Sequence, residues 1–282
     1  PPRLSAHAPV RPCSGGACTG SAIWVSAFGT ELDGTFLEEI TLPDCATTLH
    51  NAAFYNCRKL KKLSVGTAIS GIGSDEFMND SQLEHLIIRG KDSEATGLPL
   101  ILERIAENIT VSFCPNSSSS PESTVFFPEY YEWLDEISPA HIFSRSIHGE
   151  GFRMRKSFEN GILNYRKYDS CLENALTVES PESLCKIALN RLRWPSRLED
   201  IFREKYENVI KKYMGTAFTL AVKDQDFPML QFICEHFSPD ASALASAIDQ
   251  CIEKEWGEGN AFLIEAKHKS FSKKTFDFDL DF

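Results

Sequence analysis

Hydrophobic residues recur at a fixed spacing in the first third of the chain. The strings LEEITLP, LKKLSVG and LEHLIIR begin at Leu37, Leu60 and Leu83, so each starts 23 residues after the one before it. Within each string, leucine-type positions alternate with polar ones, which predicts a short strand with one apolar face. Phe54 and Phe77 follow the same period between the strings, and we expect them at equivalent buried positions.

One unit of this length cannot bury its apolar strand face alone, so successive units are expected to stack into a continuous core. A period of this length that carries LxxLxL indicates a leucine-rich-repeat solenoid. Solenoids present an extended surface, which favours binding over catalysis. The positions predicted to point inward are Leu37, Ile40, Leu42, Leu60, Leu63, Val65, Leu83, Leu86 and Ile88.

The unit resembles the BspA-type bacterial leucine-rich repeat, in which Ala-Phe, Asn-Cys and Leu recur in a fixed order. Phe54 is followed by Asn56-Cys57, and Phe77 is followed by Asn79-Asp80. The resemblance is best over residues 37–90. Residues 20–36 and 98–114 are interpreted as degenerate coils, the atypical units that cap a short solenoid.

The rest of the chain, from residue 115 onward, lacks this repeat, and its sequence pattern predicts a different organisation. Residues 115–124 (PNSSSSPEST) are rich in serine and proline and predict a hinge. From Ser180 onward, apolar residues recur at helical spacing, and two similar segments resemble degenerate ankyrin-type helix pairs. The expected organisation is a disordered leader (1–20), the solenoid (21–114), the hinge (115–124), an aromatic connector (125–179), a helical-repeat domain (180–270) and an acidic-aromatic tail (271–282).

The predicted fold class is therefore α+β, with a short leucine-rich-repeat solenoid followed by an all-helical, ankyrin-like domain. The aromatic connector, the RKYD string at Arg166–Asp169 and the tail FDFDLDF are also similar to one group of leucine-rich-repeat proteins from gut Firmicutes. This resemblance implies an architecture but no biochemical activity. The tail alternates apolar residues with aspartate, a pattern that fits an added edge strand, a disordered short linear motif or a solvated terminus.

The net charge and the spacing of the cysteines limit the classes of partner and the cell compartments that fit this sequence. The net charge is −11, which argues against nucleic acid and anionic membranes because both require a basic surface. No apolar run is long enough to span a bilayer as a helix. The nine cysteines form no CxxC pair, and we interpret them as reduced thiols of a cytoplasmic protein. The alternative is a secreted or surface adhesin whose signal peptide has been removed.

Motifs for catalysis, cofactors and metals are weak. No two of the seven histidines form HxH or HExxH, and no glycine-rich phosphate loop is present. His148 and Glu150 in the string HGEG are the most suggestive pair, although a turn that packs the connector explains them better than an active site does. We therefore predict a non-enzymatic scaffold without cofactor or metal, which binds an unidentified protein partner. The alternative is an enzyme or regulatory domain hidden in residues 125–282.

The predicted binding site is the solvent side of the strands. Since neighbouring strands lie about 4.8 Å apart, the charges there alternate down the stack as glutamate, lysine and glutamate or histidine. This pattern suits either a recognition surface or a cross-strand ladder that stabilises the sheet. The residues concerned are Glu38, Glu39, Thr41, Lys61, Lys62, Ser64, Glu84, His85 and Ile87.

Overall fold

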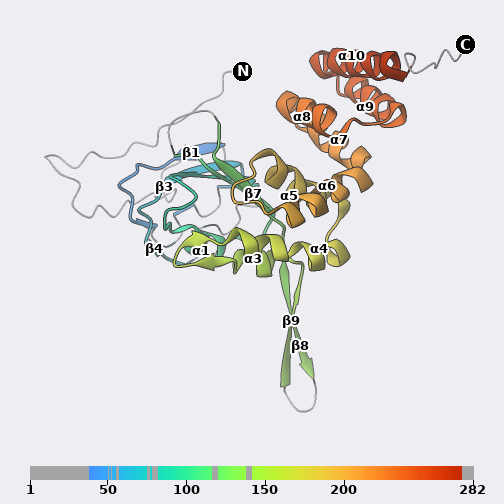
Figure 1. Ribbon diagram of the computed structural model, residues 1–282. Helices are drawn as coiled ribbons and strands as arrows, with labels where there is room; N and C mark the ends of the chain where they lie inside the picture. Colours follow the sequence, from blue (N-terminus) through green and yellow to red (C-terminus); the bar gives the residue numbers. More distant parts are fainter. Residues whose placement is uncertain are drawn as a thin grey trace, which may run out of the picture. The chain divides into compact units, whose positions relative to one another are not determined.

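The structure is a computed structural model that describes residues 38–49, 51, 53–54, 57–74, 77, 82–115, 120–137 and 142–274. Two compact units make up the chain (Figure 1). The first contains Pro1–Glu179 and Trp194–Glu199, and the second contains Ser180–Arg193 and Asp200–Phe282. The fold is α+β with a helical C-terminal region. The predicted leader (1–20) and residues 275–282 of the predicted tail lie outside the described residues.

The first unit contains a five-stranded sheet with the order β1-β3-β5-β6-β7. The first four strands run parallel, and β7 is antiparallel to β6. From β1 to β5 the pairing follows the sequence period, because Ile40 pairs with Leu63 and Leu63 pairs with Leu86. The strands are β1 (Glu39–Thr41), β3 (Lys62–Gly66), β5 (His85–Arg89), β6 (Ile109–Phe113) and β7 (Ser123–Phe127).

A second parallel pair lies between the strands of the sheet in sequence, where β2 (Thr48–Leu49) pairs with β4 (Gly71–Ile72) at the same offset. Inside the coils, Phe54 and Phe77 stack with ring centroids 5.4 Å apart. Phe54 is fully buried and Phe77 is 9% exposed. The predicted equivalence of the two phenylalanines is confirmed. The described inward positions are all buried: Ile40, Leu42, Leu60, Leu63, Val65, Leu83, Leu86 and Ile88.

Residues 115–124, predicted as a hinge, connect two neighbouring strands of one sheet. Ser123 and Thr124 already belong to β7, and they pair with Phe113 and Ser112 of β6. All five residues of β7 are buried, so the segment ends inside the core of the first unit. A composition rich in serine and proline indicates a turn, but it does not distinguish a loop within a sheet from a linker between domains.

The predicted aromatic connector (125–179) begins within β7 and continues with two further strands. β8 (Tyr131–Ile137) and β9 (Ile142–His148) form an antiparallel hairpin, which extends from the rest of its own unit as a long ribbon (Figure 1). Short elements follow and complete the first unit, together with α1 (Leu98–Leu102) earlier in the chain. They are α2 (Gly151–Arg155), β10 (Phe158–Glu159), β11 (Ile162–Leu163), α3 (Tyr165–Ser170) and α4 (Leu172–Val178).

The second unit contains six described helices: α5 (Pro181–Arg193), α6 (Asp200–Lys212), α7 (Met214–Lys223), α8 (Phe227–Phe237), α9 (Ala241–Glu253) and α10 (Gly257–Lys274). The turns after α7 and α9 have the same geometry. Gln225 and Glu255 both adopt positive φ, at 49° and 54°. The next amide donates to Ala221 in the first turn and to Cys251 in the second. The helix pair is therefore a structural repeat, while its ankyrin-like character stays a prediction.

Candidate functional site

The predicted strand-face residues come together on the first three strands of the parallel sheet. Two register rows contain six of them: Glu39, Lys62 and His85, and Thr41, Ser64 and Ile87. The other three precede the strands at the same spacing. The amide of Lys61 donates to the carbonyl of Glu38 at 2.8 Å, and the amide of Glu84 donates to that of Lys61 at 3.0 Å.

Opposite charges of the first two coils pair across the strands. Lys61 Nζ lies 3.4 Å from Glu38 Oε2, and Lys62 Nζ lies 3.6 Å from Glu39 Oε2. Both pairs are solvent-exposed, so each stabilises the sheet by less than about 1 kcal/mol. The charges therefore form the start of the predicted ladder, and they also remain accessible to a partner.

The other end of the strand face is occupied by Arg89. Its guanidinium donates to Ser64 Oγ at 2.7 Å and to Asp44 Oδ1 at 2.8 Å, and it also contacts the carbonyl of Leu42. Ser64 is consequently only 8% exposed. Ser64 is therefore closed by contacts within the sheet, whereas the exposed residues of the predicted surface are Glu38, Glu39, Thr41, Lys61, Glu84 and His85.

The string HGEG forms the root of the β8–β9 hairpin. Gly149 adopts φ +92°, and a Cβ at that position would lie 2.6 Å from the carbonyl oxygen of Glu129. At Gly151 a Cβ would lie only 1.9 Å from the carbonyl oxygen of Pro128. Both glycines are therefore required by close backbone approach, and sequence reasoning could foresee the turn but not what it supports.

His148 and Glu150 lie in different environments. The His148 ring is exposed and stacks on Tyr131 at 4.8 Å. Glu150 is 1% exposed and accepts from the side-chain amide of Asn174. Arg153 NH1 lies 3.1 Å from the other carboxylate oxygen, a charge contact without hydrogen-bond geometry. The structure gives the two residues separate structural contacts.

A buried arginine fixes the hairpin root to the sheet. Arg155 is 4% exposed. Its guanidinium donates to four backbone carbonyls, those of Ile105, Glu107, Pro128 and Gly151, over 2.6 to 3.1 Å. Burial lowers the pKa of Arg155 to about 10 against the opposing influence of nearby tyrosine and glutamate side chains. The arginine stays charged at neutral pH and holds the chain on both sides of the hairpin in place.

Thiol chemistry is disfavoured at three of the described cysteines. Burial raises the pKa of Cys171 to about 11, and it raises the pKa of Cys185 and of Cys234 to about 12. A thiol with a raised pKa contains almost no thiolate at neutral pH, and the thiolate is the nucleophile. In the described part of the chain, no group of histidine, cysteine, aspartate and glutamate could hold a metal ion. No described helix is long and apolar enough to cross a bilayer.

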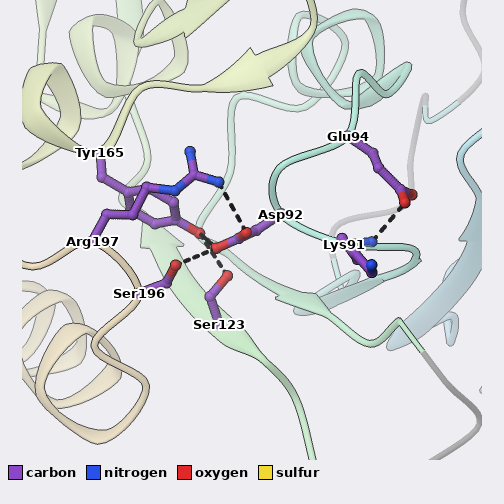
Figure 2. Close-up of polar contacts among 7 residues, drawn as sticks. All are labelled: Lys91, Asp92, Glu94, Ser123, Tyr165, Ser196 and Arg197. Carbon is purple, nitrogen blue, oxygen red and sulfur yellow. Dashed lines mark hydrogen bonds and ion pairs between the residues drawn. The ribbon is translucent and has the colours of Figure 1, made fainter.

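A polar network that the sequence did not predict surrounds Asp92, in the turn after β5 (Figure 2). Tyr165 donates its hydroxyl to Asp92 at 2.8 Å, and Ser196 also donates to this carboxylate. Arg197 NH2 lies 3.3 Å from the second carboxylate oxygen, and Ser123 lies 2.6 Å from the tyrosine hydroxyl. Asp92 is 2% exposed, so these contacts replace the water that a buried carboxylate loses.

An open cavity of about 490 Å³ lies beside this network. It contains charges of both signs, and some of them already pair, since Arg166 Nε lies 3.7 Å from Glu199 Oε1. The lining is more suited to solvent than to a large apolar ligand, and neither His148 nor Glu150 belongs to it. The lining residues are Glu159, Asn160, Ile162, Leu163, Asn164, Tyr165, Arg166, Arg197 and Glu199.

Comparisons with known proteins agree with the periodic part of the structure. No curated protein matches the chain, and no solved structure matches it. Residues 30–96 match the family model described as "BspA type Leucine rich repeat region (6 copies)". These residues contain β1 to β5, where the strand register repeats with the period of the sequence. The match supports the interpretation of this stretch as leucine-rich repeats similar to the BspA type.

Proposed function

We propose that the chain is a non-enzymatic protein-interaction module that uses its short solenoid as a recognition scaffold. The observation that carries this proposal is the leucine-rich-repeat region itself. The exposed charges at the start of its parallel strands, Glu38, Glu39 and Lys61, support this proposal. Repeat regions of this kind commonly bind other proteins through such extended surfaces.

The chemistry of the described residues supports binding over catalysis. His148 stacks on Tyr131 at the surface, Glu150 is buried and bonded to Asn174, and buried thiols with raised pKa values are poor nucleophiles. The function we propose is thus recognition of a protein partner with alternating charges, through the exposed residues of the strand face.

Charge reversal tests this function. Lys61→Glu with Lys62→Glu breaks both cross-strand pairs and reverses the surface charge. We expect the immobilised variant to retain at least tenfold less partner from a lysate of the producing cells than the parent chain retains. We also expect a stability loss of about 0.2–1 kcal/mol per pair because like charges then face each other.

A charge-swapped control separates recognition from stability. Adding Glu38→Lys and Glu39→Lys to the double variant restores both cross-strand pairs with inverted polarity. Recognition predicts that stability returns while binding remains lost. If binding returns together with stability, or never changes, then the strand face is only a stabilising ladder.

A further inference from the structure

The β8–β9 hairpin exposes more large apolar surface than any other described element. Tyr131, Trp133, Leu134 and Ile147 are 59%, 56%, 65% and 38% exposed. The remaining exposed large apolar residues of the described chain are distributed over separate helices, with one or two in each. Contiguous exposed apolar groups with a polar border are typical of interaction sites.

The exposed residues occupy both faces of the ribbon. Pairing places Tyr131 opposite His148 and Trp133 opposite Ser146 on one face. The pairs Glu132–Ile147 and Leu134–Arg145 alternate with them and therefore lie on the other face. Tyr131 and Trp133 are exposed on one face and Leu134 and Ile147 on the other, so a partner can contact the ribbon from two sides.

The hairpin is rigid at its root and poorly stabilised along its length. An isolated two-stranded hairpin is at best marginally stable in water. Here Arg155 fixes the root through its hydrogen bonds to backbone carbonyls. In addition, the amide of Tyr130 donates to the carbonyl of Ala106, and the amide of Glu129 donates to Asn108 Oδ1. These contacts fix the point at which the ribbon leaves the rest of the first unit.

The size of the ribbon favours a partner that encloses it. Two seven-residue strands make a ribbon about 24 Å long and about 10 Å wide, so one face offers only about 240 Å². A stable interface buries about 800 Å² on each partner. Stacking of two hairpins through one face falls well short of this area, whereas a cleft that covers both faces and both edges approaches it.

The charge of the ribbon defines the rim of that cleft. Residues 131–148 contain Glu132, Asp135 and Glu136 but only one arginine. Arg145 is paired with Glu132, which leaves an excess of negative charge around the exposed Trp133. We infer, on the basis of the proposed function, that the hairpin is a docking arm that inserts into an apolar cleft with a basic rim on a protein partner.

Site-specific photo-crosslinking tests the docking arm. A photoreactive amino acid replaces Leu134 in the full chain, which is expressed in its producing cells and irradiated. The expected adduct joins position 134 to one protein, at a peptide that contains apolar residues and is flanked by lysine or arginine. The same residue placed at Ile252, which is 59% exposed in α9, serves as the matched control and is expected to give no such adduct.

Two variants test the chemistry of the contact once that protein is purified. Trp133→Ser should weaken binding at least tenfold, as expected for an aromatic anchor, while the melting temperature stays unchanged. Asp135→Asn keeps an acceptor for Trp133 Nε1, which lies 2.5 Å from Asp135 Oδ1. It should weaken binding severalfold at low salt, and the difference should disappear at high salt because the charges are then screened.

Other outcomes overturn the docking arm. They are an adduct with a second copy of the chain, insertion into phosphatidylcholine vesicles reported by a blue shift of tryptophan emission, or a partner peptide without basic residues. If the strand-face variants lose a partner that Trp133→Ser retains, then the proposed function stands and the docking arm fails. If the parent chain retains no protein at all, then both fail.

Discussion

At the scale of single residues, the structure assigns packing roles to groups that looked chemical in the sequence. Glu150 lies at the start of α2, and its amide donates to Glu179 Oε1 at 2.7 Å. Burial is the main cause that raises the pKa of Glu179 above its ordinary value of 4.5, and the Glu150 carboxylate contributes in the same direction. Two acidic groups therefore meet near the hairpin root, and the cost of this contact depends on pH.

The raised pKa predicts the effect of Glu179→Gln. Because the folded state binds this proton more tightly than the unfolded chain, the carboxyl stabilises the fold below about pH 4.5. That contribution is lost as the pH rises through the folded pKa. The glutamine side chain keeps an oxygen that accepts from the backbone amide of Glu150, and it carries no charge. The variant should therefore match the melting temperature of the parent at pH 4.5 and exceed it at pH 7.

Thermal melts of parent and variant at both pH values measure this difference. Glu84→Gln, at an exposed position on the strand face, is the control and should show no comparable gain between the two pH values. A Glu179→Gln variant that melts below the parent at pH 7 would contradict the assigned environment.

At the scale of elements, the sequence predicts the strands that recur with the repeat, but it does not predict the β8–β9 hairpin or the Asp92 network. Each repeat places one leucine-type residue, such as Leu63 or Leu86, in the same buried row of the sheet, and the regular period makes that row visible in the sequence. In the β8–β9 hairpin, the adjacent residues Trp133 and Leu134 lie on opposite faces of the ribbon, and both are exposed. The sequence pattern of this hairpin therefore does not distinguish a buried face from a solvent-exposed one. The Asp92 network joins segments far apart in the sequence, and no local pattern reports such a contact.

The stacked phenylalanines give the element-scale prediction. Phe54→Ala removes a fully buried ring from its 5.4 Å stack on Phe77 and should cost about 3–5 kcal/mol of unfolding free energy. Phe54→Leu keeps most of the apolar volume and should cost less. Urea unfolding followed by circular dichroism measures both values. If Phe54→Ala unfolds at the same urea concentration as the parent, the register of the coils is wrong.

At the scale of the whole molecule, the two units are not separated by one linker. The chain passes from the first unit to the second after Glu179, returns at Trp194 and leaves again after Glu199. The returning loop supplies Ser196 and Arg197 to Asp92. A cut after residue 179 would therefore remove two partners of a buried carboxylate in the first unit. Domain limits drawn from sequence order alone cannot describe this arrangement.

A double-mutant cycle around Asp92 tests whether the loop of residues 194–199 stabilises the first unit through its contacts to this carboxylate. We call this stabilising role of the loop the clasp. In the parent chain, Asp92→Asn weakens contacts to Tyr165, Ser196 and Arg197 and should cost about 1–3 kcal/mol. In a chain with Ser196→Ala and Arg197→Ala, the buried carboxylate has lost two of its partners, so the same Asp92→Asn change should be neutral or stabilising.

Urea unfolding of the four chains gives the coupling between the loop and Asp92. Arg166→Ala is the matched control, since Arg166 is 77% exposed and lies 3.7 Å from its partner Glu199, and exposed pairs of this kind contribute little. Additive effects of Asp92→Asn and the loop changes would contradict the clasp. A reversal of sign would show that the loop stabilises the first unit through this one carboxylate, and that an intact first unit requires residues 194–199.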